Sequence, residues 1–207
     1  MKKLLSITVC ALLLIGAMSV NVSAETYTQD YIKYTVDEAS GTAYVSNADM
    51  NIKNANIVSE INGYKVTSIG ESAFANSTSL TTVTIPDTVT TIGKMAFGEC
   101  TALSSVTFGN SVETIESSAF STCTSLLSID LPDSVTTIGY GAFQDSSAIE
   151  TISLPQNVTS IGEHAFYGTA LFMDESSWQN DVLYIDNYLI KGKTSLVGRY
   201  TVKSGTK

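Results

Sequence analysis

Hydrophobic residues recur along the middle of the chain with a fixed 23-residue period. In each period a Val is followed three positions later by an Ile, and an Ala-Phe pair comes after the Ile. A period between about 20 and 50 residues is typical of repeat architectures such as solenoids. Five copies keep this spacing without a slip: Val66, Ile69, Ala73 and Phe74; Val89, Ile92, Ala96 and Phe97; Val112, Ile115, Ala119 and Phe120; Val135, Ile138, Ala142 and Phe143; Val158, Ile161, Ala165 and Phe166.

Apolar and polar residues alternate in the short segments that lie between these copies. Alternation with a period of two predicts a β-strand with one buried face. Pro86, Pro132 and Pro155 follow three of the segments and Gly109 follows the fourth, so each strand is expected to end there. We therefore expect one short strand per repeat, then a turn and a return segment that carries the Val, Ile, Ala and Phe. The four segments are residues 80–85, 103–108, 126–131 and 149–154.

A single repeat of this kind is too small to fold alone, because its few inward side chains cannot offset the conformational entropy of its backbone. When repeats stack, each strand pairs with the next at about 4.8 Å and the apolar rows merge into one core. The pattern therefore predicts a mainly β solenoid of leucine-rich-repeat type, with one short parallel strand per repeat and turns or helical turns on the return side.

The repeat resembles the BspA-like leucine-rich-repeat family of secreted and cell-surface proteins. The family consensus reads approximately Leu-Xaa-Xaa-Val-Xaa-Ile-Pro-Xaa-Xaa-Val-Xaa-Xaa-Ile-Gly-Xaa-Xaa-Ala-Phe-Xaa-Xaa-Cys, and residues 66–170 follow it. Residues 31–64 resemble the N-terminal β cap of the family. The resemblance implies a right-handed solenoid with a parallel sheet on its concave face. It also implies a non-enzymatic role, usually adhesion to host or matrix proteins or to other cells.

Residues 1–24 have the organisation of a secretory signal peptide. Lys2 and Lys3 precede an apolar run over residues 4–18, and small residues follow. We expect cleavage between Ala24 and Glu25 and a secreted or surface-associated mature chain. The alternative is an uncleaved membrane anchor, for which the stretch from residue 4 to residue 20 is short.

The remaining chain divides into three parts. Residues 25–65 are expected to form the β cap and residues 66–176 the solenoid. The repeat register breaks in residues 177–207, where a divergent β-hairpin is expected around Asp186-Asn187, because that pair suits a two-residue turn. Residues 200–205 resemble the start of an incomplete following repeat. The chain could also be a truncated repeat fragment, or a targeting module of a larger surface protein or secreted glycan-acting enzyme.

Composition excludes some partners. The net charge is -9, with 20 acidic against 11 basic residues. The chain therefore lacks the basic footprint that nucleic acid or an anionic membrane surface would need. Ser and Thr number 53, so hydroxyl groups carry much of the polarity. No phosphate-binding loop or other cofactor motif occurs, and no cofactor or membrane insertion of the mature chain is expected.

Cys100 and Cys123 stand one repeat apart, so they should occupy neighbouring rungs of the stack. A disulfide is possible at that separation and in a secreted protein. Ser77 and Ser146 hold the equivalent places, however, which favours small buried side chains with reduced thiols. Two cysteines without paired histidines cannot form a structural zinc site.

Catalytic chemistry is weakly supported by the sequence. His164 is the single histidine, and its column varies between repeats, as expected of a surface residue. Asp130 and Glu150 could form a carboxylate pair for glycoside hydrolysis. They fall on neighbouring rungs but in different columns, so we expect that the protein is not an enzyme.

The outward positions of the expected strands are the best candidates for a binding surface, because solenoids present broad rigid faces to their partners. The partners would be extracellular or host proteins, or glycans. The alternative is that hydroxyl side chains merely suit a solvated sheet. The positions form two columns: Thr82, Ser105, Ser128 and Thr151; and Thr84, Thr107, Asp130 and Ser153.

Overall fold

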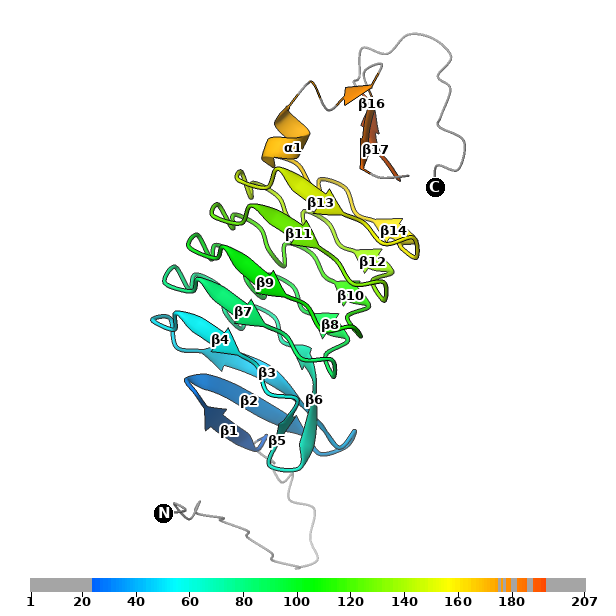
Figure 1. Ribbon diagram of the computed structural model, residues 1–207. Helices are drawn as coiled ribbons and strands as arrows, with labels where there is room; N and C mark the ends of the chain where they lie inside the picture. The colour runs from blue at the N-terminus through cyan, green and yellow to red at the C-terminus, as the bar shows by residue number, and fades with distance from the viewer. Residues whose placement is uncertain (1–23, 175, 177, 180–181, 186–187, 193–207) are drawn as a thin grey trace, which may run out of the picture.

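The chain winds into an elongated solenoid in which each repeat makes one turn (Figure 1). The computed structural model describes residues 24–174, 176, 178–179, 182–185 and 188–192. The expected signal peptide, apart from its last residue, lies outside these residues. Two parallel ladders of strands run along the rod. The first contains β7 (Thr82–Thr84), β9 (Ser105–Thr107), β11 (Ser128–Asp130) and β13 (Thr151–Ser153), and the second β8 (Thr91–Ile92), β10 (Thr114–Ile115), β12 (Thr137–Ile138) and β14 (Ser160–Ile161).

The solenoid fold is confirmed, but each turn holds two strands where the sequence predicts one. The expected strand is the one in the first ladder. The second is only two residues long and lies in the return segment, where Thr114 and Ile115 pair with Thr137 and Ile138 of the next turn. Alternation cannot reveal so short a strand. The buried residues of the return segment are also three positions apart, as in Val112 and Ile115.

A third ladder of backbone hydrogen bonds joins the Ala-Phe segments of successive turns. Ser72, Phe74 and Asn76 donate their N–H groups to carbonyl oxygens of the next turn at 2.8 to 2.9 Å, and later turns repeat the pattern. In each turn the first and the last of these three donor residues adopt a left-handed backbone, which costs about 1–2 kcal/mol for a residue with a side chain. Ten residues occupy these two columns: Ser72, Met95, Ser118, Gly141 and His164; and Asn76, Glu99, Thr122, Asp145 and Gly168.

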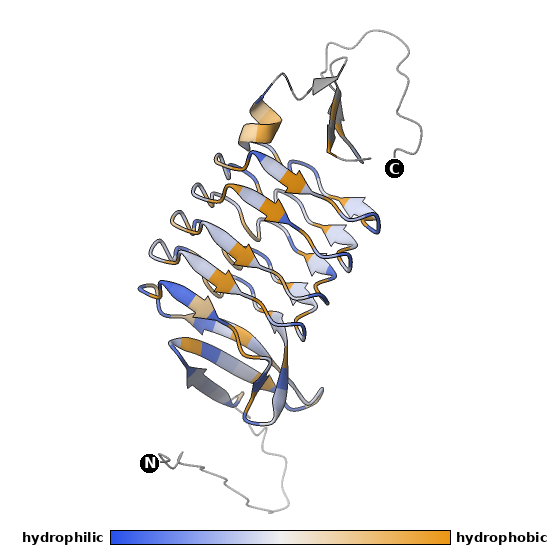
Figure 2. Ribbon diagram, in the orientation of Figure 1, coloured by the Kyte–Doolittle hydropathy of each residue, from blue (hydrophilic) through white to orange (hydrophobic). Residues whose placement is uncertain are grey.

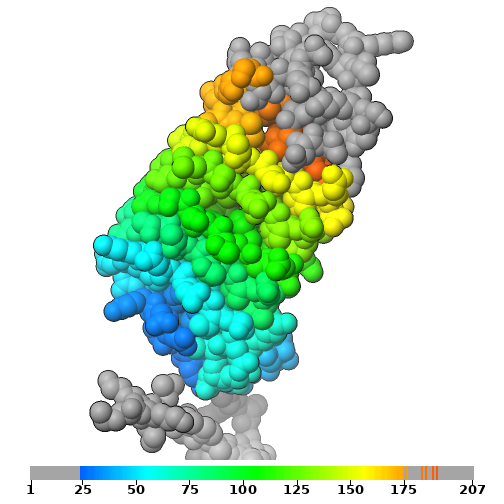
Figure 3. Space-filling view, in the orientation of Figure 1, coloured from blue at the N-terminus to red at the C-terminus, as the bar shows by residue number. Residues whose placement is uncertain are grey.

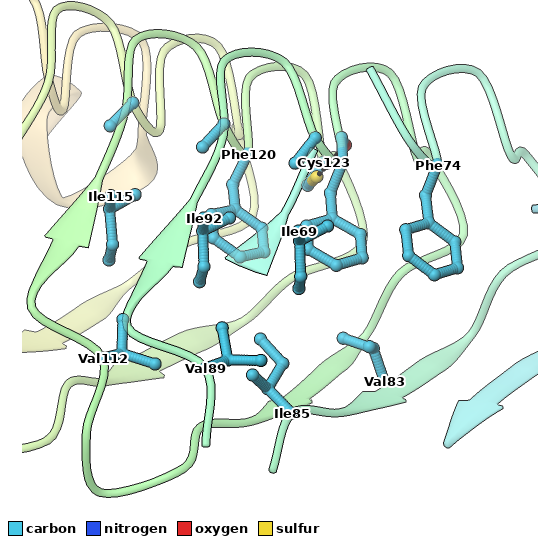
Figure 4. Close-up of a cluster of buried hydrophobic side chains, with 14 of the residues drawn as sticks. Ile69, Phe74, Val83, Ile85, Val89, Ile92, Val112, Ile115, Phe120 and Cys123 are labelled. Carbon is cyan, nitrogen blue, oxygen red and sulfur yellow. Dashed lines mark hydrogen bonds between the residues drawn. The ribbon is translucent and has the colours of Figure 1, made fainter. Parts of the chain in front are cut away.

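The core consists of identical side chains stacked in rows between the ladders. The five Phe rings form one row, with neighbouring ring centroids 4.9 to 5.7 Å apart and nearly parallel. Figure 4 shows Phe74 and Phe120 in this row, with Val89 and Val112 in a second. The middle residue of each strand in the first ladder is apolar between polar neighbours (Figure 2). Burial of these rows is what holds the turns together.

The first ladder is interrupted between β9 and β11, which belong to separate sheets. Phe108 stands at the end of β9 where the other turns have Ile or Leu, and its ring meets the edge of Phe120 with the centroids 5.9 Å apart. Val106 in β9 is only half-buried, whereas its equivalents in the other turns are buried. The larger Phe108 ring therefore coincides with the loss of strand pairing on this side, while the other two ladders continue.

The N-terminal cap extends both sheets. An antiparallel meander of β1 (Thr26–Gln29), β2 (Ile32–Asp37) and β3 (Thr42–Ala48) leads to β6 (Tyr64–Ile69), which pairs with β3 in parallel. β5 (Glu60–Ile61) forms a short hairpin with β6. β4 (Asn54–Asn56) pairs with β7 and so begins the first ladder.

The hairpin expected near the C-terminus is present, as β16 (Val182–Ile185) and β17 (Tyr188–Gly192), and β15 (Trp178–Gln179) adds a third strand. The four-residue helix α1 (Ala170–Met173) joins it to the solenoid, and the Thr169 hydroxyl caps its first turn by accepting from the N–H of Phe172. The expected turn at Asp186-Asn187 and residues 200–205 lie outside the described residues. Within the described part of the chain, no helix has the length and apolarity needed to span a membrane.

Glycine after the repeat Ile allows successive turns to approach closely. A Cβ atom at Gly139 would lie 2.5 Å from the backbone nitrogen of Ser117 in the preceding turn. Glu116 takes the equivalent place in the middle copy, and its carboxylate accepts a hydrogen bond from the N–H of Lys94 at 2.9 Å. The position after the repeat Ile is therefore sterically constrained in the copies that carry glycine there.

Gly139→Ala is expected to lower the free energy of unfolding by about 1–3 kcal/mol, because the new methyl group must push two turns apart. Gly98→Ala is the matched control, since a Cβ there meets nothing closer than 3.4 Å. Urea denaturation of the two variants measures the difference. Equal stabilities would contradict the packing argument.

Candidate functional site

The structure places all eight sequence-predicted binding residues on one side of the solenoid, at the outer positions of β7, β9, β11 and β13 (Figure 1). Every one is exposed, because the middle residue of each three-residue strand points inward. Successive turns follow one another as bands along the rod in the space-filling view (Figure 3). The predicted columns therefore exist as rows on the surface.

Two residues that the sequence analysis did not predict extend these rows by one rung. Asn54 pairs with Thr82 and Asn56 with Thr84, and both asparagines are exposed. Each precedes its partner by more than one repeat period, so a search at that period misses them. The polar-apolar-polar order of Asn-Ala-Asn was the available signal. We call these two residues, with the eight predicted ones, the hydroxyl face.

Apart from the carboxylate of Asp130, the hydroxyl face offers neutral hydrogen-bonding groups. The Thr82 hydroxyl donates to the side-chain oxygen of Asn54 at 2.8 Å, and the neighbouring Thr81 hydroxyl donates to the carbonyl of Lys53 at 2.9 Å. Leu127, 61% exposed, lies beside the rows. Short side chains with both donors and acceptors suit a polar and uncharged surface of a partner.

The two acidic residues considered for glycoside hydrolysis do not converge. Asp130 pairs with Ser153 at one end of β11 and β13, whereas the N–H of Glu150 bonds the carbonyl of Leu127 at the other end. A cavity of about 140 Å³ next to Asp130 is lined by residues 108, 110 and 130–132, and Glu150 is not among them. Among the described residues, no cluster of three or more His, Cys, Asp or Glu could hold a metal ion.

The single histidine lies outside the hydroxyl face. His164 is exposed in the last complete turn, and its Nδ1 lies 3.1 Å from the hydroxyl oxygen of Tyr140 one turn earlier. Its ring also meets the edge of Tyr167, with centroids 5.5 Å apart. The residue belongs to an aromatic row on the Ala-Phe side of the solenoid.

The two cysteines among the described residues, Cys100 and Cys123, are free thiols and are fully buried. Cys100 and Cys123 donate to carbonyl oxygens of the preceding turn, those of Phe74 and Phe97, at 3.1 and 3.2 Å. The Ser146 hydroxyl makes the equivalent bond to Phe120 at 2.7 Å. In these three copies a small donor therefore bonds the backbone of the neighbouring turn, which fits the occurrence of both Ser and Cys. The buried hydroxyl of Ser77, in the first copy, has no hydrogen-bond partner among the described residues.

The repeat geometry described above matches a known sequence family. The model of the BspA type leucine rich repeat region matches residues 66–197 in six copies. The chain belongs to the BspA-type leucine-rich repeat family. The resemblance seen in the sequence is thereby confirmed. No curated protein matches the chain in sequence.

Solved structures of bacterial leucine-rich repeat proteins share the fold. A leucine-rich repeat protein of T. pallidum is 27% identical, with a TM-score of 0.64, over 69% of this chain and 67% of that one. One from Bacteroides ovatus is 34% identical (TM-score 0.60; 68% of this chain, 38% of that one). A protein of Faecalibacterium prausnitzii described as a leucine rich cell surface protein is 31% identical (TM-score 0.55; 72% and 48%). The chain thus spans less than half of the latter two.

The buried thiols should make stability fall at alkaline pH. Burial raises the pKa of the Cys100 thiol from 9.0 to about 12 and raises that of Cys123 as well, with the neighbouring thiol adding to the effect. An unfolded chain ionises these thiols above pH 9, whereas the folded chain does not. The contribution of the two thiols to the free energy of unfolding should therefore stay constant below pH 9. It should fall between pH 9 and 12, by at most about 1.4 kcal/mol per pH unit for each thiol.

Urea denaturation as a function of pH measures this effect, with the Cys100→Ser/Cys123→Ser variant as the matched control. Ser already fills the same column at Ser77 and Ser146, so the variant should fold and lose part of the slope. Burial also raises the pKa of Tyr34, which leaves a residual slope. Identical slopes for the two proteins would contradict the assignment, as would rapid reaction of a thiol reagent with Cys100 or Cys123 in the native chain.

Proposed function

We propose that this BspA-type protein is secreted or surface-associated and binds extracellular or host proteins, or glycans, through the hydroxyl face, without catalysis. The observation that carries the proposal is the exposure of all eight predicted residues in two rows along the first ladder, on the sheet of β7 and β9 and on that of β11 and β13. A solenoid presents such a surface to its partners without rearranging.

The composition of the hydroxyl face supports a broad hydrogen-bonding contact in place of a charged one. Asp130 is the acidic member of the rows, and the others are Ser, Thr or Asn. Hydroxyl and amide groups can bond the hydroxyls of a glycan or the backbone of a protein. The description of a similar solved protein as a cell-surface protein agrees with the proposed location.

Binding should be lost when bulky cations replace three residues of the face, in the triple variant Thr84→Arg/Thr107→Arg/Asp130→Arg. Each Arg side chain would cover the neighbouring hydroxyls and change the local charge. The measurement is binding of the chain to immobilised matrix proteins, a glycan array and host cells. We expect a loss of at least about tenfold in affinity, as for truncation of central contact residues.

The matched control is Glu113→Arg/Thr159→Arg/Ser160→Arg, at three exposed residues in or beside β10 and β14 of the other sheet. Each triple variant gains one positive charge for every Thr or Ser replaced and two for the acidic residue, so both variants change the net charge by +4. Equal losses for the two variants would show a non-specific charge effect. Unchanged binding by the first variant would place the partner elsewhere.

A further inference from the structure

A pocket of about 600 Å³ lies in the N-terminal cap, beside the start of β4. Two segments line it. The turn between β1 and β2 contributes Asp30 and Tyr31, and the connection from β3 into β4 contributes residues 49 and 51–54. Figure 1 shows this turn on the same side of the rod as the start of β4, and in Figure 3 the blue and cyan segments lie next to each other at that edge. The volume is in the range of small-molecule sites.

Backbone hydrogen bonds hold the two segments of the pocket together. The N–H of Asp49 donates to the carbonyl of Tyr31 at 2.9 Å. Within the second segment, the N–H of Ile52 donates to the carbonyl of Asp49 at 3.0 Å, and the carboxylate of Asp49 accepts from the N–H of Asn51 at 2.8 Å. The pocket is therefore formed before any ligand arrives, which lowers the entropic cost of binding.

The ring of Tyr31 is displayed by a turn that would suit a glycine better. Asp30 and Tyr31 have φ angles of 51° and 68°, and the residues on either side, Gln29 and Ile32, pair with each other. They are thus the two central residues of a type I′ hairpin turn, which usually has glycine in the second place. A bulky residue with positive φ is uncommon and points to a role other than folding. The Tyr31 side chain is 72% exposed.

Four polar groups of the pocket are available to a ligand. Within the described part of the chain, the carboxylate of Asp30 and the ammonium group of Lys53 have no hydrogen bond or ion pair. The side-chain NH₂ of Asn51 donates to Asp49 at 3.2 Å, which leaves its oxygen as an acceptor. The side-chain oxygen of Asn54 accepts from two threonine hydroxyls of the next turn at 2.8 and 3.1 Å, which leaves its NH₂ group as a donor.

An aromatic ring together with free donors and acceptors suits a sugar. One face of a pyranose ring is covered by C–H groups and can lie against an aromatic ring. Its hydroxyls both donate and accept, so they can bond the two acceptors and the two donors of the pocket. The two carboxylates, of Asp30 and Asp49, outnumber the single ammonium group of Lys53, which disfavours an acidic sugar.

We propose that this pocket binds one neutral sugar residue of a glycan, with its C–H face on the Tyr31 ring and its hydroxyls bonded to Asp30 and Asn54. The pocket adjoins the hydroxyl face, with which it shares Asn54. The proposal goes beyond the proposed function, because sugar binding here does not require the Ser and Thr rows of β7, β9, β11 and β13 to bind a partner.

Titration of the whole chain with methyl β-galactoside, methyl β-glucoside and methyl α-mannoside, followed by NMR, tests the proposal. At least one of these sugars should shift the amide resonances of residues 30, 31, 49 and 51–54. Glucuronate is the acidic probe and should bind at least about tenfold more weakly than that sugar, because the carboxylates of the pocket repel it.

Tyr31→Gly should lower the affinity for the sugar at least about tenfold, because the stacking surface is lost. Its free energy of unfolding should be unchanged or higher, since glycine suits the turn, and this separates lost binding from lost folding. Tyr140→Gly is the matched control. It removes another exposed tyrosine, 49% exposed and outside the pocket, and should leave sugar binding unchanged.

The variant Thr84→Arg/Thr107→Arg/Asp130→Arg should keep its affinity for the sugar, so a failure of the pocket and a failure of the hydroxyl face are seen separately. The absence of shifts with all three sugars at tens of millimolar would overturn the proposal. Unchanged sugar binding by Tyr31→Gly would also overturn it, and so would equal binding of glucuronate. If Tyr31→Gly instead loses binding to immobilised matrix proteins and no sugar binds, the pocket contacts a protein and the proposal is wrong.

Discussion

Hydrogen bonding between the backbones of successive turns is the constraint on which the rest of the structure depends. Three ladders run along the rod, two between strands and one between the Ala-Phe segments. They hold the turns at one spacing, so a side chain at a given position always meets its equivalent in the next turn. That spacing permits parallel stacking of the Phe rings, restricts the residue after the repeat Ile to glycine in most copies, and selects a small donor at the Cys and Ser column.

The period and the strands of the first ladder follow from the sequence, because burial of one face imposes alternation on segments such as residues 82–84. The second strand of each turn was not predictable from alternation, since it is two residues long. The place of Asn54 and Asn56 was hidden because the connection after β4 departs from the period. The interruption at Phe108 depends on how one ring fills three-dimensional space, and the residue itself fits the apolar pattern.

Inward and outward residues of the solenoid are under different structural constraints. Inward positions repeat because each must pack against a copy of itself, and a change in one turn affects two interfaces. Outward positions such as Thr84 and Asp130 meet no such requirement and can vary with the partner. Sequence reasoning therefore locates a candidate surface by position, whereas the identity of the ligand depends on side chains that the fold leaves free.

The interruption between β9 and β11 has a mechanical consequence. The hydrogen bonds between turns lie roughly along the axis of the rod, so a pulling force applied to its two ends loads the turns in series. At this one interface two ladders share the load that three carry between the neighbouring repeats. Under tension, as on a protein held between two surfaces, the rod should part first between the turns of Phe120 and Phe143, and the segments on either side should stay folded longer.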